Sequence, residues 1–133
     1  VDTVPGHIYA YDFKPGSGTL KNKRVFASIP DRDGRPDGLT VDSEGGVWCA
    51  IWDGWCLHRY LPDGTLDQVL DMPIPRPTSL TFGGPELNTL FVTSARTRLP
   101  ASTLSEAPLS GGVFAFQPSQ TGLPTGIFEL GTP

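Results

Sequence analysis

Residues 36–52 read PDGLTVDSEGGVWCAIW: a Pro-Asp-Gly step, a short apolar segment, a Gly-Gly turn and a second apolar segment. Residues 77–83 read PTSLTFG and begin a similar pattern, in which a polar turn leads to an apolar run from Leu90. The two copies lie roughly 40 residues apart, a period found in arrays of repeated structural units. The runs are short and rich in β-branched and aromatic residues, so each copy predicts a strand, a turn and a second strand.

A second pair of strands is predicted three times along the chain. In the first strand of each pair, apolar and other side chains alternate with the period of a β-strand. These first strands lie at residues 7–12, 56–61 and 112–117. A turn with Pro and Gly follows each, because Pro presets φ and Gly accepts positive φ. The final strands lie at residues 24–27, 66–70 and 126–130.

Four short strands recurring in this way are typical of a blade of an antiparallel β-propeller. We therefore predict an all-β fold with about two and a half four-stranded blades. Residues 1–30 form the two outer strands of one blade, residues 31–74 a complete blade, and residues 75–133 another with a longer loop at residues 97–111. Within that loop, residues 103–108 are expected to form a short helical turn.

So few blades cannot close a ring, which needs typically four to eight of them. The chain also starts at Val1 without Met, as expected of a trimmed or cleaved polypeptide. We expect the remaining blades to come from a missing N-terminal part, from further copies or from another chain.

Composition and charge exclude several classes of function. The net charge is −4, and the densest basic group is Lys21, Lys23 and Arg24, so no surface is predicted to bind nucleic acid. No apolar stretch approaches the roughly 20 residues needed to cross a bilayer, and no signal peptide is recognisable. We therefore expect a soluble, cytoplasmic protein that does not contact a membrane.

Two cysteines, Cys49 and Cys56, flank a predicted Asp53-Gly54 turn. This position on neighbouring strands would allow a disulfide, but nothing else in the sequence supports one. Because the spacing matches no zinc pattern, we expect buried free thiols.

Several stretches resemble the C-terminal half of the gluconolactonase and regucalcin family (senescence marker protein). Members of that family carry a Pro-Asp-Gly step, an apolar strand and Asp-x-Glu-Gly before an apolar-Trp pair, as residues 35–48 do here. Residues 76–96 and residues 111–114 resemble the segments that follow in the same order. The resemblance covers most of the chain.

The resemblance implies a six-bladed propeller that holds one divalent cation, calcium or zinc, in its central channel. In the family, a glutamate from the first blade, an asparagine from the middle of the chain and the Asp of Pro-Asp-Gly hold this cation, and only the last maps here, onto Asp37. The implied function is metal-dependent hydrolysis of a sugar lactone, with Asp37 as metal ligand and general base. We expect the isolated chain to be inactive, because one carboxylate cannot hold the cation in a catalytic geometry.

Asp37 also has a structural interpretation, since Asp-Gly after Pro is a common turn. Pro62-Asp63-Gly64 is expected to be such a turn between outer strands. Pro36-Asp37-Gly38 instead opens a new blade, and together with the resemblance this favours the functional role.

Four further residues are candidate substrate contacts. Thr78 occupies the repeat position equivalent to Asp37, where its hydroxyl would contact substrate, orient water or bond the backbone. Trp52 lies with Asp53 and Trp55 at a turn that either borders the site or packs aromatic rings around an Asp-Gly corner.

Ser94 and Arg96 occupy the corresponding place in the next blade. Arg96 would attract an anionic sugar acid or pair with a neighbouring carboxylate. The remaining polar residues receive no role: His7 and His58 are expected on outer strands, and Asp42, Glu44 and Asp63 are expected to be solvated turn carboxylates.

Two functions therefore remain open. One is a lactonase that acts on a small cyclic ester. The other is a non-catalytic propeller fragment that serves as a binding or scaffold module, since a fold alone does not fix function.

Overall fold

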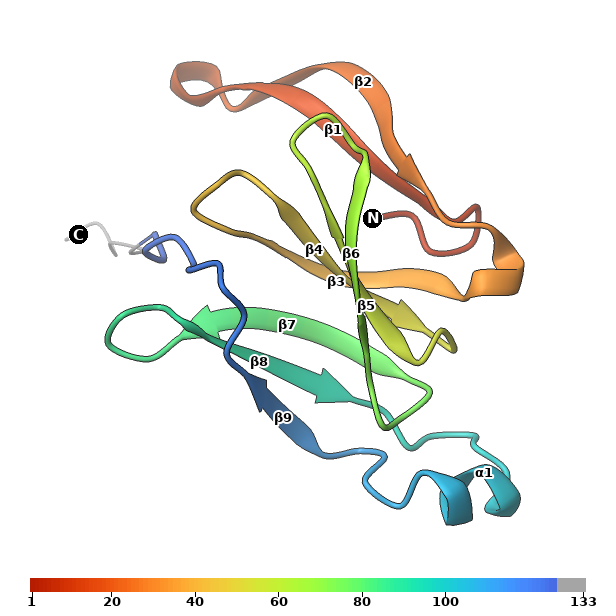
Figure 1. Cartoon of the computed structure of the whole chain (residues 1–133). Helices are drawn as coiled ribbons and strands as arrows, with labels where there is room; N and C mark the ends of the chain where they lie inside the picture. Colours follow the sequence, from red (N-terminus) through yellow and green to blue (C-terminus); the bar gives the residue numbers. More distant parts are fainter. Residues whose placement is uncertain (127–133) are drawn as a thin grey trace, which may run out of the picture.

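A computed structural model describes residues 1–126 and shows strands arranged in three antiparallel sheets (Figure 1). The first sheet pairs β1 (His7–Lys14) with β2 (Thr19–Ser28). The middle sheet contains β3 (Arg35–Val41), β4 (Val47–Trp52), β5 (Cys56–Tyr60) and β6 (Leu66–Asp71). The third sheet contains β7 (Pro77–Gly83), β8 (Thr89–Ser94) and β9 (Val113–Phe116).

Helical structure in the described part of the chain is brief, and the all-β prediction is confirmed. It consists of two 3₁₀ turns, Pro15–Ser17 and Asp31–Asp33, and of α1 (Ala101–Glu106), which lies in the loop before β9. The predicted helical turn thus exists but ends before Ala107, which precedes a proline and is disfavoured in the α region. Within residues 1–126, no helix has the length and apolar character required to cross a membrane. The strand predicted at residues 126–130 lies outside the described residues, apart from its first position.

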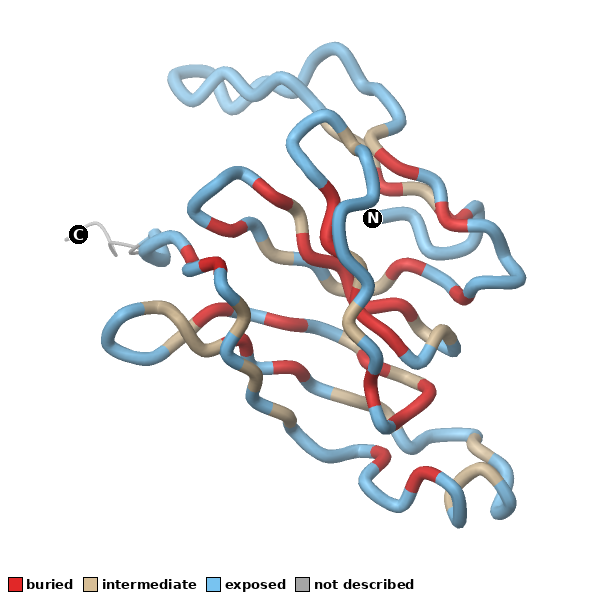
Figure 2. Tube along the Cα trace, in the orientation of Figure 1, coloured by how far each residue is buried: buried red, intermediate tan, exposed pale blue. Residues whose placement is uncertain are grey.

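The two central strands of the middle sheet, β4 and β5, are buried on both faces, and Figure 2 shows buried segments concentrated there. Side chains of β4 alternate between two apolar layers. Trp48 and Ala50 pack in one layer with Leu57, Leu80, Phe82, Leu90 and Val92. Cys49 and Ile51 pack in the other with Ile8, Ala27, Ile29, Cys56 and Tyr60. Burial on both faces explains why β4 is a continuous apolar run instead of an alternating one.

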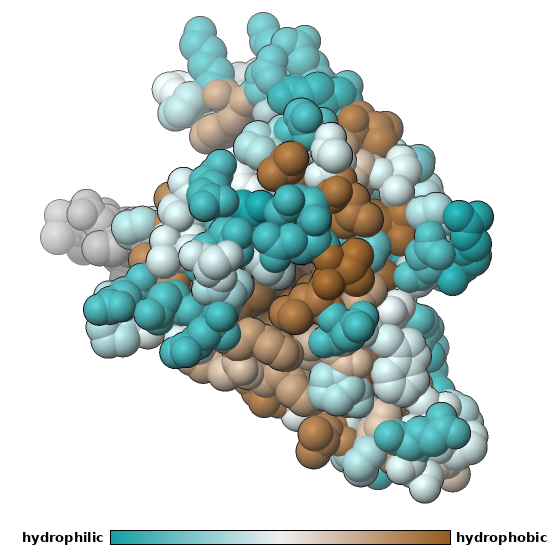
Figure 3. All heavy atoms as spheres, viewed as in Figure 1, coloured by the Kyte–Doolittle hydropathy of each residue, from teal (hydrophilic) through white to brown (hydrophobic). Residues whose placement is uncertain are grey.

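The outer strand β6 leaves one edge of the middle sheet exposed. Leu66 and Val69 are among its exposed apolar side chains. Figure 3 shows hydrophobic atoms gathered near the middle of this face, with hydrophilic atoms toward the ends of the molecule. Asp67 and Asp71 place carboxylates on the same strand, a common protection of a sheet edge against further pairing.

The first strands of the middle and third sheets lie close together, since β7 packs against β3 and β4. A Cβ atom at Gly38 would lie 2.7 Å from Cα of Ser79 on β7. Only a residue without a side chain fits there. The layer behind this contact is fixed by the edge-to-face pair of Trp48 and Phe82, whose ring centroids lie 6.4 Å apart.

A buried ion pair joins the turns and strands of the middle sheet. Arg59 Nε donates to Asp42 Oδ2 at 2.7 Å, and both side chains are almost completely enclosed. Asp42 also accepts hydrogen bonds from the backbone N–H groups of Glu44 and Gly46 and from the Trp48 indole. The prediction of a solvated carboxylate at Asp42 is therefore wrong, because strand pairing carries Arg59 against the β3–β4 turn and closes it off from water.

Arg59 also reaches two carboxylates at the surface. Its Nη2 donates to Glu44 Oε2 at 2.7 Å and its Nη1 to Asp67 Oδ2 at 2.6 Å. Gly46 makes room for this guanidinium, because a Cβ there would lie 2.6 Å from Nη2 of Arg59. Glu44 and Asp63 are exposed, as predicted.

The segment after β9 returns to the middle sheet. The Ser43 backbone N–H donates to the Thr121 carbonyl at 2.8 Å, and the two hydroxyls lie 2.9 Å apart. Next to it, the Gly122 N–H donates to the Leu87 carbonyl at 2.7 Å. A side chain at Gly122 would collide with Phe82. We call residues 120–123 the clasp, because they tie the middle sheet to the third.

Replacing Asp42 is expected to destabilise the chain strongly. Asp42→Asn leaves Arg59 buried with its one fully enclosed counter-charge removed, so the free energy of unfolding at pH 7 should fall by about 3 kcal/mol. Urea titration followed by tryptophan fluorescence measures the change. Asp63→Asn makes the same chemical change in an exposed turn and should cost less than about 1 kcal/mol. Equal, small losses in both variants would contradict this role for the pair.

The same pair predicts a pH dependence of stability. Burial opposes ionisation of Asp42, but hydrogen bonds from Arg59, Gly46 and Trp48 outweigh it, so the pKa of Asp42 lies below its ordinary value. Its contribution is complete above the unfolded-state pKa of about 3.9 and is lost as pH falls below that value through the lowered folded pKa. The stability difference between wild type and Asp42→Asn should therefore shrink on acidification.

The two cysteines are free and buried, as predicted, and should be unreactive in the folded chain. Burial raises the pKa of Cys49 to about 12 and that of Cys56 to about 11, so the reactive thiolate is scarce at pH 8. We expect Ellman's reagent to label both thiols promptly in denaturant but slowly without it. Prompt labelling of the native chain would show that the layer around Cys49 opens readily.

Candidate active site

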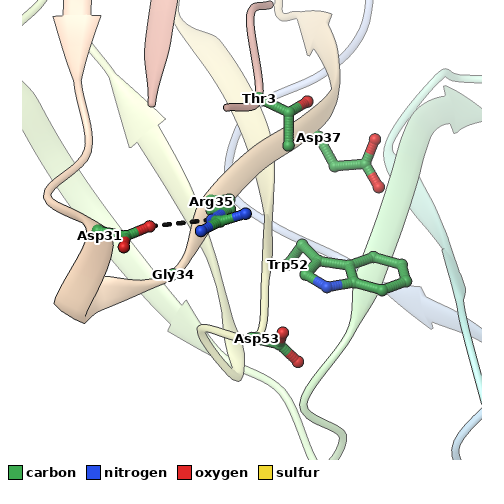
Figure 4. A pocket seen from close by; sticks show the side chains of 7 residues that line it. All are labelled: Thr3, Asp31, Gly34, Arg35, Asp37, Trp52 and Asp53. Carbon is green, nitrogen blue, oxygen red and sulfur yellow. Dashed lines mark hydrogen bonds and ion pairs between the residues drawn. The ribbon is translucent and has the colours of Figure 1, made fainter. Parts of the chain in front are cut away.

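An open pocket with a cavity volume of about 430 Å³ lies where β3 begins and β4 ends (Figure 4). Its walls come from the N-terminal segment, the 3₁₀ turn before β3, and the β4–β5 turn. The lining residues are Thr3, Asp31, Gly34, Arg35, Asp37, Trp52 and Asp53.

A β-bulge positions Asp37. Pro36 pairs with Ile51 and Leu39 with Cys49, so two residues of β3 face one residue of β4. Bulges bend a strand and redirect a side chain, which suits a functional position. The third sheet repeats the feature: β7 has a register shift between Pro77 and Ser79, at Thr78. The repeat seen in the sequence is thus a repeat of backbone geometry.

Asp37 is a carboxylate without an ion-pair partner among residues 1–126. Its side chain is half-buried, and this desolvation raises its pKa, while a hydrogen bond with the Gly38 backbone offsets only part of the effect. In Figure 4 the Asp37 carboxylate and the Trp52 ring border the same space, whereas Arg35 turns toward Asp31. The pocket therefore presents one available carboxylate beside an aromatic surface.

Arg76 fixes the wall opposite Asp37. Its guanidinium lies 4.7 Å from the Trp52 ring centroid, and its Nε donates to Asp53 Oδ1 at 2.5 Å. Its Nη1 donates to the Thr97 carbonyl at 2.6 Å. Asp53 occupies a left-handed backbone conformation, with φ of 60°, at the corner of the β4–β5 turn. These contacts hold both Trp52 and Asp53 at the pocket rim.

Sequence reasoning gave Arg76 no role, although a signal was present. Each of the two bulges directly follows an Arg-Pro pair, Arg35-Pro36 in β3 and Arg76-Pro77 at the start of β7. Each arginine is held by a carboxylate, since Arg35 Nε donates to Asp31 Oδ1 at 2.9 Å. The repeated pair therefore indicates an arginine next to each bulge that is held in place by a carboxylate.

Thr78, Ser94 and Arg96 do not line this pocket. The Thr78 hydroxyl lies 2.8 Å from that of Thr93 on β8. The Ser94 hydroxyl donates to the Gly112 carbonyl at 2.8 Å and secures the start of β9. Arg96 is exposed, and no ion pair among residues 1–126 includes it.

The two histidines also lie outside the pocket. His7 Nδ1 lies 3.0 Å from the Ser28 hydroxyl, and His58 Nδ1 lies 2.8 Å from the Tyr60 hydroxyl. Burial lowers the pKa of His58. Trp55 shares the β4–β5 turn and is partly exposed there, but it does not line the pocket.

One carboxylate cannot form a metal site by itself. Within residues 1–126, no group of three or more His, Cys, Asp or Glu side chains is close enough to hold a metal ion. A desolvated, unpaired carboxylate such as Asp37 does suit a hard cation that prefers oxygen ligands. The Asp37 carboxylate thus offers one ligand for a cation, and the same group can accept a proton.

Comparison with known proteins places these features in context. The chain is 39% identical to L-arabinolactonase of Azospirillum brasilense over 132 residues, or 99% of this chain and 43% of the relative. It is 38% identical to 6-deoxy-6-sulfogluconolactonase of Pseudomonas putida, covering 94% of this chain and 43% of the relative. The chain thus spans less than half the length of these relatives.

The fold matches a solved structure over almost its whole length. The crystal structure of a calcium-binding protein, regucalcin, from Agrobacterium tumefaciens superimposes with a TM-score of 0.90 and 27% identity, covering 98% of this chain and 44% of that one. This likeness confirms that the three sheets are part of a β-propeller. Residues 1–96 also match a family model. The chain therefore belongs to the SMP-30/Gluconolactonase/LRE-like region family.

Proposed function

We propose that this chain contributes one wall of the active site of a sugar lactonase, with Asp37 as its reactive carboxylate. The observation that carries this proposal is the position of Asp37: half-buried, without an ion-pair partner among residues 1–126, and set by a bulge beside a pocket. The names of the lactonase relatives support the substrate class.

Lactone hydrolysis needs a water oxygen to attack the ester carbonyl carbon while the water loses a proton. Asp37 would accept that proton. The ring C–O bond then breaks, and the departing oxygen takes up a proton to give the open hydroxy acid.

A divalent cation is the proposed cofactor, with calcium as the first candidate and zinc as the second. Asp37 would be one of its oxygen ligands, and the others would come from blades outside residues 1–126. A bound cation supplies Lewis-acid polarisation of an ester carbonyl. Thr78, Ser94 and Arg96 stay candidate substrate contacts of lower rank, since they do not line the pocket.

The arrangement of the sheets supports a six-bladed ring as the working assembly. Residues 1–30 would be the outer half of one blade, residues 31–74 a whole blade and residues 75–133 another. The remaining blades would come from a preceding segment or from a second polypeptide. The alternative function, a non-catalytic binding or scaffold module, is favoured by one observation: the described residues contain no group of three or more His, Cys, Asp or Glu side chains that could hold a metal ion.

Asp37→Asn is expected to lower lactonase kcat/KM by about 10²-fold or more, because the amide cannot accept the proton from water. Activity is measured by pH-indicator assay on the protein that holds this chain together with the blades that close the ring. The matched control is Asp63→Asn, which alters the same Pro-Asp-Gly tripeptide in an outer turn and should leave kcat/KM unchanged. Unchanged activity of Asp37→Asn would refute its assigned role.

The isolated chain should bind calcium and zinc only weakly and should not turn over gluconolactone. A single carboxylate gives too few ligands for a cation that takes six to eight oxygens, as calcium does. Calorimetric titration of the 133-residue chain with each metal, together with the lactonase assay, checks this expectation. Tight binding with turnover would show that the chain completes a site by itself or by self-association.

A further inference from the structure

A threonine hydroxyl lies in the Asp37 pocket without a hydrogen-bond partner among residues 1–126. This residue, Thr3, is exposed and belongs to the turn before β1, whereas Asp37 belongs to the middle sheet. Figure 4 shows Thr3 beside Asp37, on the side of the pocket away from Asp53. Segments next to two different sheets therefore border the same space.

The turn that carries Thr3 is tied to the segment that leads into β3. Asp2 and His7 exchange both backbone hydrogen bonds, at 2.8 and 3.0 Å, and the Gly6 N–H donates to the Thr3 carbonyl at 3.3 Å. The Ile29 N–H then donates to the Gly6 carbonyl at 2.8 Å. Gly6 has φ of 70°, and a side chain there would collide with the Ile29 carbonyl. Thr3 is thus held in place beside the pocket before a ligand binds, which reduces the entropy lost on binding.

The charged side chains of the pocket are engaged elsewhere. Arg35 donates to Asp31 at 2.9 Å, and Asp53 accepts hydrogen bonds from an arginine behind the pocket rim. Asp37 is assigned to the cation and to the proton of the attacking water. The Thr3 hydroxyl is uncharged, and it can both donate and accept a hydrogen bond. This is the hydrogen-bonding capacity of a hydroxyl group on a sugar lactone as well.

We infer that Thr3 is a substrate-binding residue, whose hydroxyl bonds a hydroxyl group of the lactone that does not react; this inference rests on the proposed function. The reacting carbonyl and the attacking water must lie within reach of Asp37, so Thr3 contacts another part of the ring. A hydrogen bond to an unreactive group is equally strong in the bound substrate and in the transition state. Such a bond lowers KM and leaves kcat unchanged.

Thr3→Val tests the inference on the protein that holds all blades of the ring, because it keeps the branched shape and removes the hydroxyl. KM for gluconolactone should rise roughly threefold to tenfold, the effect of one neutral hydrogen bond, with kcat unchanged. Thr3→Ser retains a hydroxyl and should restore a KM close to that of wild type. Thr65→Val is the matched control, since it makes the same change in the exposed turn before β6, and its KM should equal that of wild type.

A second substrate separates the loss of a hydrogen bond from damage to the pocket. δ-Valerolactone is a cyclic ester of the same kind without hydroxyl groups, so Thr3→Val should hydrolyse it with the kcat/KM of wild type. An equal fall in kcat/KM for both lactones overturns the role of Thr3. An unchanged KM for gluconolactone in Thr3→Val, or a Thr3→Ser variant as impaired as Thr3→Val, overturns it too, and each of these results leaves the proposed function standing. A wild-type protein that hydrolyses neither lactone overturns the proposed function, and this inference with it.

Discussion

The enclosed pair of Asp42 and Arg59 is the interaction on which the middle sheet depends. Arg59 lies on β5, Asp42 directly follows β3, and the other partners of the guanidinium include Asp67 on β6. The Trp48 indole brings β4 into the same network. One charged group thus links all four strands and leaves little freedom to slide one strand past another. Because side chains alternate along a strand, a slip of one residue would exchange the two apolar layers of β4.

This fixed register determines where the candidate site lies. The network occupies one end of β3, and the bulge at Asp37 lies toward the other end, where Pro36 pairs with Ile51. Gly38 then lets β7 approach, which brings the segment before β7, and with it Arg76, beside the end of β4. The site is therefore a product of strand register, a bulge and one glycine, rather than of a loop with its own fold.

The sequence alone predicted the repeat and the strands, because period-two patterns and Pro-Gly turns are local signals. It also singled out Asp37, which lines the pocket, and the role of that carboxylate stays a prediction. It failed for Asp42, whose burial depends on Arg59, 17 positions away. It also gave no role to Arg76, whose contacts with Trp52 and Asp53 cross from one sheet to the next. Repeat equivalence suggested that Thr78 would share the environment of Asp37, but Thr78 does not line the pocket, whose walls include Thr3 and the β4–β5 turn.

The clasp has a consequence for how the polypeptide acquires its structure. It pairs Ser43 with Thr121, a separation of 78 residues, and Gly122 fills a space beside Phe82. Contacts between residues so far apart in the sequence slow folding, because the entropy of closing the intervening chain is lost before the contact is gained. During synthesis on the ribosome, the β3–β4 turn of the middle sheet can therefore form its contact with Thr121 only after the chain has emerged at least that far.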